Sequence, residues 1–268
     1  MSGLRRSAMA LLACLYLAAL AAGWLAPAGY AGQFRESPSA PPSRKFLLGT
    51  DELGRDSFAR LLYGSRISLT LAPAAAGLGI LIGAIAGVAA GYLGGWLDIC
   101  LSRLADLFLS VPWLFLLLSV RATLPLNVNP LESIAITFLL LGLLGWAVPA
   151  RIVRAAARQL KGEDFMLQAR ARGCSPLRML TLHLLPSMRP VLAAQFWTSI
   201  PLFILSETNL GFLGLGIAEP LPSWGNLLAG LQKIDVVASS PWRLAPLVLL
   251  LLVMACFHLI VPLEDPSR

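Results

Sequence analysis

The stretch of this chain with the clearest functional chemistry is basic and lies between Arg151 and Arg189. Its centre reads Leu-Gln-Ala-Arg-Ala-Arg-Gly over residues 167–173, and after nine further residues it continues as His-Leu-Leu-Pro over residues 183–186. A basic, helix-forming insert of this kind suits the docking of another protein or contact with lipid headgroups. The sequence therefore indicates recognition at this insert.

The sequence contains few residues in patterns typical of catalytic or metal-binding sites. The two histidines, His183 and His258, fall in different predicted layers, which argues against a zinc or bis-histidine haem site, and Ser175 lacks a Gly-x-Ser-x-Gly setting. No Gly-x4-Gly-Lys-[Ser/Thr] phosphate loop occurs. We expect a chain that is not an enzyme and holds no cofactor or metal. Neither metal-type spacing nor a disulfide framework is found among the cysteines, which are Cys14, Cys100, Cys174 and Cys256.

One acidic residue, Glu207, lies deep in an apolar stretch and precedes the segment Leu-Gly-Phe-Leu-Gly-Leu-Gly over residues 210–216. An ionisable residue in such a position suggests a transport pathway or gate, with Asn209 and Phe212 as its neighbours. The alternative is that Glu207 sits at the outer interface, hydrogen-bonded to nearby groups. The sequence leaves both interpretations open.

These residues must be positioned by membrane helices. The chain has 268 residues, of which 57% are hydrophobic and 13% charged, with a mean hydropathy of +0.75. So much apolar surface cannot be buried in one water-soluble core. We predict an all-α polytopic membrane protein with about six transmembrane helices, at roughly residues 8–26, 68–92, 100–120, 132–150, 190–216 and 244–262.

The distribution of cations predicts the orientation. Eight Lys and Arg residues lie between positions 151 and 189, against only Glu163 and Asp164, so this insert belongs in the cytoplasm. Both termini are then cytoplasmic, and the net charge of +7 reflects topology and lipid contact instead of nucleic-acid binding. A cleaved signal peptide is the alternative for the first apolar run, but its length of about 19 residues favours a retained helix.

A row of glycines marks the second predicted span. Gly79, Gly83, Gly87 and Gly91 recur at intervals of four and share one helix face, so another backbone can approach closely. The partner is either another helix of the same chain or a helix across a subunit interface or moving pathway.

Capping residues shape the basic insert, called the elbow below (residues 151–189). The cations at 151, 154, 158 and 161 lie on one face of a helix that continues the fourth span. Glu163 and Asp164 suit the start of a short helix, and Gly173 supplies its left-handed end. Ser175 begins a second short helix as N-cap, and Pro186 returns the chain to the membrane.

Each short helix of the elbow has an apolar face. A hairpin this short cannot bury both faces alone, which favours docking on another protein over packing on its own membrane helices. The residues concerned are Phe165, Met166 and Ala169 on the first helix, and Leu177, Leu180 and Leu184 on the second.

Residues 49–64 predict a turn followed by a short amphipathic helix. Phe58, Leu61 and Leu62 share one face, while Asp56 and Arg60 stand on the other. This pattern is typical of a helix that lies along the membrane surface.

The core at 167–173 followed by 183–186 resembles the EAA motif of bacterial ABC importer permeases, although Leu167 and Gln168 depart from its Glu-Ala. A Leu at the first position and a His three residues before the Pro are similar to the branch that imports dipeptides, oligopeptides or nickel. Segments 48–56, 91–98, 212–216 and 222–225 also resemble that branch and appear in the expected order.

This resemblance implies a type I ABC importer permease fold in a bacterial inner membrane. An N-terminal helix and linker would cover residues 1–45 and the permease core residues 46–268. It implies a second, related permease subunit, two ATP-binding subunits that hold ATP and Mg²⁺, and an extracytoplasmic substrate-binding protein. The implied ATPase-coupling residues are Phe165, Met166, Leu167, Ala169, Arg170, Gly173, Leu185 and Pro186.

Peptide is the expected cargo, and nickel or a metal chelate is the alternative for the same machine. A more distant alternative is a secondary transporter driven by an ion gradient. That mechanism needs intramembrane ionisable relays and usually an internal repeat, and Glu207 is the only strong candidate for a relay.

Overall fold

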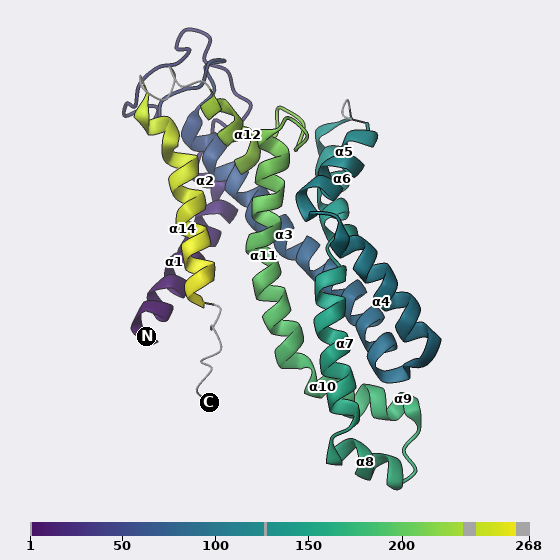
Figure 1. Ribbon diagram of the computed structural model, residues 1–268. Helices are drawn as coiled ribbons and strands as arrows, with labels where there is room; N and C mark the ends of the chain where they lie inside the picture. Colours follow the sequence, from purple (N-terminus) through teal and green to yellow (C-terminus); the bar gives the residue numbers. More distant parts are fainter. Residues whose placement is uncertain (1, 126–127, 233–239, 261–268) are drawn as a thin grey trace. The chain divides into compact units, whose positions relative to one another are not determined.

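The computed structural model describes residues 2–125, 128–232 and 240–260 (Figure 1). Regular secondary structure in these ranges is helical throughout, and extended pairing is limited to isolated bridges between Gln33 and Arg55 and between Thr50 and Asp56. The predicted all-α class is confirmed. The chain divides into two compact units.

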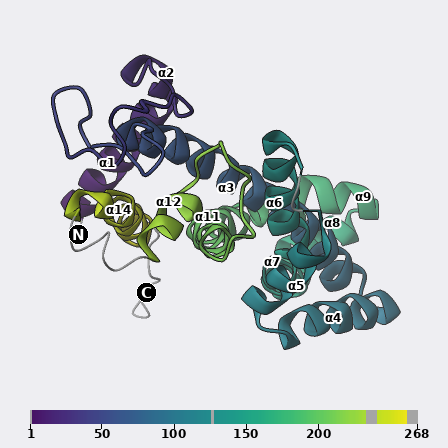
Figure 2. The same ribbon diagram turned by 90° about the horizontal axis from the view of Figure 1, so that it is seen from above.

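Unit 1 comprises residues 1–72, 121–138 and 201–268. Here α1 packs along α14, and the two helices lie side by side in both views (Figures 1 and 2). The elements of this unit are α1 (Ser2–Leu20), α2 (Ala22–Leu25), the first part of α3 (Ser57–Val88), the first part of α6 (Pro130–Leu144), the last part of α11 (Arg189–Phe212), α12 (Trp224–Ala229), the 3-10 turns Gly230–Gln232 and Pro241–Leu244, and α14 (Ala245–Ile260).

Unit 2 comprises residues 73–120 and 139–200. It holds the remainder of α3, α6 and α11, and α7 packs against both α4 and the π-helical turn η1. Its other elements are η1 (Ala89–Leu93), α4 (Gly95–Ser110), α5 (Trp113–Thr123) up to residue 120, α7 (Ala147–Lys161), α8 (Asp164–Ala171), α9 (Pro176–Met179), the π-helical turn η2 (Leu180–Leu184) and α10 (Leu185–Ser187).

Length and composition identify the segments able to cross a membrane. Among the described residues, four helices qualify, at residues 3–20, 57–93, 130–161 and 241–260. Two bent pairs, α4 with α5 and the run from α9 to α10 with α11, raise the number to six if each counts as one span. The prediction of a polytopic protein with about six spans is confirmed, although the last two residues predicted for the sixth span lie outside the described residues.

The third predicted span differs from the single helix expected at 100–120. It consists of α4 and α5, which meet at an angle of 88°. Val111 stands between them in an extended conformation, with φ −93° and ψ 129°. A residue before proline is restricted in this way, so Pro112 ends α4 and starts a new helical direction.

The expectation of a separate surface helix within residues 49–64 is wrong. Residues from Ser57 onward form the first turns of α3, which runs without a break to Val88. Asp56 caps this helix, since its Oδ1 accepts hydrogen bonds from the backbone N–H groups of Phe58 (2.9 Å) and Ala59 (3.4 Å). Amphipathic spacing over two turns does not distinguish an isolated helix from the start of a long one.

Candidate functional site

Local capping builds the elbow as the sequence predicts. Gly173 has a φ of +77°, the left-handed conformation that ends α8. Its N–H donates to the carbonyl of Arg170 (3.0 Å), and the N–H of Cys174 donates to that of Ala169 (3.1 Å), which is the Schellman pattern. Ser175 then caps α9, because its hydroxyl accepts from the N–H of Arg178 (3.4 Å).

A buried apolar cluster holds the elbow to its membrane helices. Met166 of α8 is 1% exposed, and Leu184 of η2 is fully buried. Both pack with side chains from α3, η1 and α7 inside unit 2. The cluster, called the elbow core below, consists of Val88, Tyr92, Val153, Ala157, Met166, Ala169, Met179, Leu184 and Met188.

The apolar faces predicted for the two short helices are divided by this packing. Met166 and Ala169 point into the elbow core, whereas Phe165 and Leu167 remain 37% and 50% exposed. On the second helix, Leu177 is 71% exposed. Of the other predicted coupling residues, Arg170 and Gly173 are exposed, and Leu185 and Pro186 are half-buried. One set of side chains thus packs inward, and another set leaves an open apolar surface, on which docking of another protein stays a prediction.

Polar contacts connect the elbow to η1, the turn that follows α3. The Nζ of Lys161 donates to the backbone carbonyl of Tyr92 (2.7 Å) and lies 5.6 Å from the centroid of its ring. The hydroxyl of Tyr92 lies 3.9 Å from the Sδ of Met179, which belongs to α9. Tyr92 therefore contacts the elbow both before α8, at Lys161, and after it, at Met179.

The glycine row of α3 packs against α6 and α7 of the same chain. A Cβ built on Gly87 would lie 2.6 Å from the carbonyl oxygen of Ala150 and 2.8 Å from the Cβ of Val153. One built on Gly91 would lie 2.5 Å from the carbonyl oxygen of Arg154. Such distances leave no room for a side chain, so this face lies against helices of the same chain, as the in-chain interpretation describes.

Glu207 lies in a polar nest of unit 1, formed by α3, α11 and α12. Its side chain is completely buried, and the hydroxyl of Ser68 donates to its Oε2 (3.2 Å). Ser68 also accepts from the N–H of Trp224 (3.4 Å), whose indole Nε1 donates to Ser65 (2.9 Å). This geometry resembles the hydrogen-bonded alternative more than an open pathway. Asn209 and Phe212, by contrast, are exposed.

An ion-pair network in the same unit has no counterpart in the sequence-based predictions. Arg60 is 3% exposed and its Nη2 lies 2.8 Å from Oε1 of Glu219, while Nη1 of Arg55 lies 2.7 Å from Oε2. Arg55 also binds Asp51 through its Nε (2.6 Å). Burial alone would lower the pKa of Arg55, but the hydrogen bonds and charges of Asp51 and Glu219 outweigh it and raise the pKa above its usual value.

Comparison with known proteins assigns the family. Residues 79–267 match the family model described as the inner membrane component of binding-protein-dependent transport systems. The chain belongs to this family.

Curated members of the binding-protein-dependent transport family are similar over most of the chain. It is 34% identical over 204 residues to the oligopeptide transport system permease protein OppC of Bacillus subtilis, covering 76% of this chain but 64% of that relative. The dipeptide transport system permease protein DppC of the same organism is 33% identical, with 86% and 70% covered. A di/tripeptide permease protein of Pseudomonas aeruginosa is 35% identical, with 88% and 78% covered.

The fold has a solved counterpart as well. A chain of the MetNI methionine ABC transporter, in an inward-facing crystal form, superposes with a TM-score of 0.56 at 19% identity and covers 76% of this chain and 95% of that one. The expected type I importer permease fold is confirmed, and this chain is a multi-pass membrane component of the binding-protein-dependent transport family.

Proposed function

We propose that this chain is the membrane-spanning permease subunit of an ATP-driven peptide importer. It would form half of the translocation pathway, with a second, related permease forming the other half. An extracytoplasmic binding protein would deliver the cargo, and two ATP-binding subunits would supply the energy. The observation that carries this proposal is the elbow, a rigidly capped and internally packed hairpin with an open apolar surface, in a chain of this transport family.

The charge distribution supports a cytoplasmic elbow. Its eight cations resist translocation, so the elbow and both termini would face the cytoplasm of the bacterial cell.

ATP hydrolysis would take place in the partner subunits, because the sequence lacks a phosphate-binding loop. ATP and Mg²⁺ would be held there, and this chain would contribute no catalytic group, cofactor or metal ligand. Phe165 and Leu167 would seat in the ATPase, since they are exposed apolar groups on α8. Met166 and Ala169 would act from the other side of the same helix by passing the force to the elbow core.

Peptide is the cargo that the relatives support best, because the permeases compared above are named for oligopeptide, dipeptide and di/tripeptide transport. A binding assay on the partner binding protein tests this assignment directly. Tight binding of peptides is expected, and tight nickel binding without peptide binding would contradict it while leaving the importer mechanism intact.

The docking role of α8 is tested by a charge placed on its open face. In the complete transporter reconstituted in liposomes, Leu167→Asp should reduce peptide uptake and substrate-stimulated ATP hydrolysis by at least tenfold, because burying an unpaired charge costs several kcal/mol. Gln159→Asp adds the same charge at an exposed position of α7 outside the predicted docking residues and serves as the control. Unchanged uptake and ATPase activity in Leu167→Asp would refute the assignment of α8 to the ATPase interface.

A further inference from the structure

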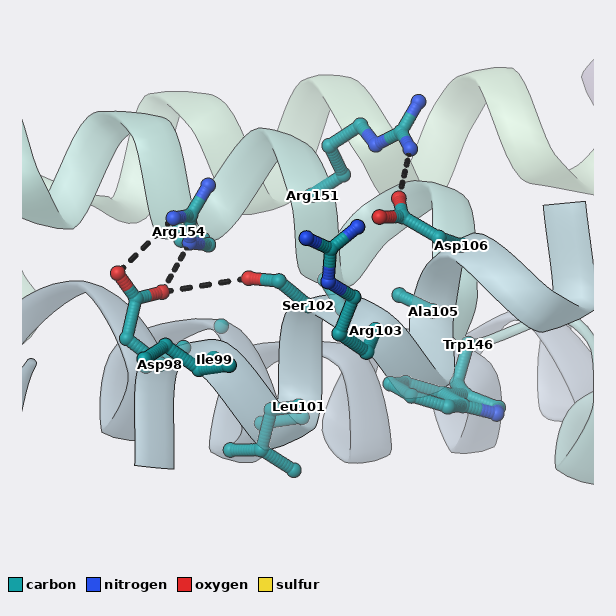
Figure 3. A pocket seen from close by; sticks show the side chains of 14 residues that line it. Asp98, Ile99, Leu101, Ser102, Arg103, Ala105, Asp106, Trp146, Arg151 and Arg154 are labelled. Atoms are coloured by element: carbon teal, nitrogen blue, oxygen red, sulfur yellow. Dashed lines mark hydrogen bonds and ion pairs between the residues drawn. The ribbon is translucent and has the colours of Figure 1, made fainter. Parts of the chain in front are cut away.

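Unit 2 contains a cavity of about 390 Å³ between α4 and α7 (Figure 3). Its volume falls within the range of roughly 300–1,000 Å³ typical of small-ligand sites. Small and apolar side chains form one part of its lining, and charged and polar side chains form the other part, called the rim below. The apolar lining includes Ala86, Ala90, Ile99, Ala105, Trp146 and Ala150, and the polar rim consists of Asp98, Ser102, Arg103, Asp106, Arg151 and Arg154.

Two ion pairs join α4 to α7 along this rim. Asp98 accepts hydrogen bonds from Nε and Nη2 of Arg154, the second at 2.9 Å, and from the hydroxyl of Ser102 (3.2 Å). Arg151 binds Asp106 two turns further along α4. The two pairs differ in exposure, since the Arg154 and Asp98 side chains are 31% and 19% exposed, whereas those of Arg151 and Asp106 are 58% and 46% exposed.

Arg103 is the third arginine of the rim, and its positive charge is not balanced by either of the two aspartates. Its side chain is exposed, lines the cavity and forms no ion pair within the described part of the chain. Figure 3 shows its guanidinium on the rim between Ser102 and the Arg151–Asp106 pair. With Arg151 only singly engaged by Asp106, the rim offers several free N–H donors next to an apolar lining.

We propose that this cavity binds the phosphate of an anionic phospholipid. Arg103 and Arg151 would hold the phosphate, and the Ser102 side of the rim would face the glycerol. Basic pockets between transmembrane helices recognise lipid headgroups in this way. The apolar lining distinguishes a lipid from a soluble anion, because only a lipid brings hydrocarbon to Ile99 and Trp146.

The charges of the site explain the preference for an anionic headgroup. The rim carries three arginines and two aspartates, which leaves one net positive charge. An anionic headgroup would neutralise this charge, whereas a zwitterionic headgroup has no net charge and would not. Because Arg151 and Arg154 belong to the elbow, the lipid would come from the cytoplasmic leaflet, and this assignment rests on the proposed topology. Binding itself depends only on the cavity. Failure of lipid binding would thus leave the importer proposal untouched.

Two substitutions on neighbouring turns of α4 test the proposal in opposite directions. Native mass spectrometry of the detergent-purified transporter complex, titrated with phosphatidylglycerol, measures lipid affinity. Arg103→Gln should weaken binding about tenfold, the loss expected for one charge-assisted hydrogen bond. Asp106→Asn should strengthen it, because Arg151 loses its competitor. Arg189→Gln, an exposed cation outside the cavity, is the control for general surface attraction.

Titrations with two other ligands, phosphatidylcholine and glycerol phosphate, identify the class of ligand. Phosphatidylcholine should bind at least tenfold more weakly than phosphatidylglycerol, and glycerol phosphate should fail to displace the lipid. Equal losses in Arg103→Gln and Arg189→Gln, or equal affinity for the two lipids, would overturn the proposal. Displacement by glycerol phosphate at the same concentration would assign the site to a soluble anion, and a helix of the second permease found over the rim would assign it to a protein contact.

Discussion

Unit 1 and unit 2 hold their helices together by opposite means. In unit 2, the glycine row of α3 brings backbone against backbone, with α7 so close that no Cβ fits between them. In unit 1, the same helix α3 is tied by charged and polar side chains, through Arg60 to Glu219 and through Ser68 to Glu207.

The difference teaches how one helix can serve two purposes. Backbone contact fixes the position of α3 on α7 within narrow limits, because any added atom overlaps its neighbours. Polar side chains fix a helix by direction and charge, and they tolerate small changes of shape as long as the donors and acceptors remain. Substitutions that add atoms at the glycine contact should therefore affect unit 2, and substitutions that remove a charge or a hydrogen bond should affect unit 1.

The largest effect is expected from filling the glycine contact. Gly87→Leu places a branched side chain where even a Cβ would lie 2.6 Å from a carbonyl oxygen, so little or no folded chain should be recovered from membranes. Gly77→Leu is the matched control on α3, since nothing lies within 4 Å of its Cβ position. Equal yields and thermal stability of the two variants would contradict the close contact.

An intermediate effect is expected from the ion-pair network. Arg60→Gln leaves Glu219 with Arg55 alone, and we expect a loss of about 2 kcal/mol in unfolding free energy, less than for a fully buried pair because Glu219 is half exposed. Chemical denaturation of the purified chain measures this loss. Arg66→Gln removes an exposed cation of the same helix, and a loss as large in that variant would show that net charge, not the pair, is responsible.

The smallest effect is expected at Glu207, if its role is to hold the nest together. Glu207→Gln keeps the shape and an acceptor for Ser68, so assembly and transport should both stay close to normal, with a stability change below about 1 kcal/mol. Glu207→Ala removes the acceptor and should cost about 2 kcal/mol. Loss of transport in the Gln variant with intact assembly would instead place Glu207 in the transport pathway.

The sequence predicted most features that depend on local chemistry. Gly173, Ser175 and the acidic start of α8 specify the elbow by capping, and the four-residue spacing of the glycines specifies a close helix contact. The helical class follows from composition alone. These signals are readable because each lies within a few turns of the residues on which it acts.

Features that depend on tertiary contacts could not be predicted. Glu219 lies 159 residues from Arg60 in the sequence, and neither residue is in a pattern that predicts the other. Likewise, Asp106 has a cation three residues before it in the sequence, Arg103, but the residue it binds is Arg151 of α7. The same holds for the apolar face of α8, where Met166 is buried and Phe165 is exposed. Helical spacing predicts which residues share a face, but it does not predict which other helices cover them.

The elbow core is also unusual in its sulfur content. Three of the six methionines of the chain, Met166, Met179 and Met188, lie in this one cluster. Thioether side chains are unbranched and polarizable, so they refill a changing space at little cost. A joint between helices that is packed with such side chains stays free of voids when its shape changes slightly. The same chemistry is a weakness under oxidants, because sulfoxide formation would put polar, chiral groups into the joint and stiffen or break it.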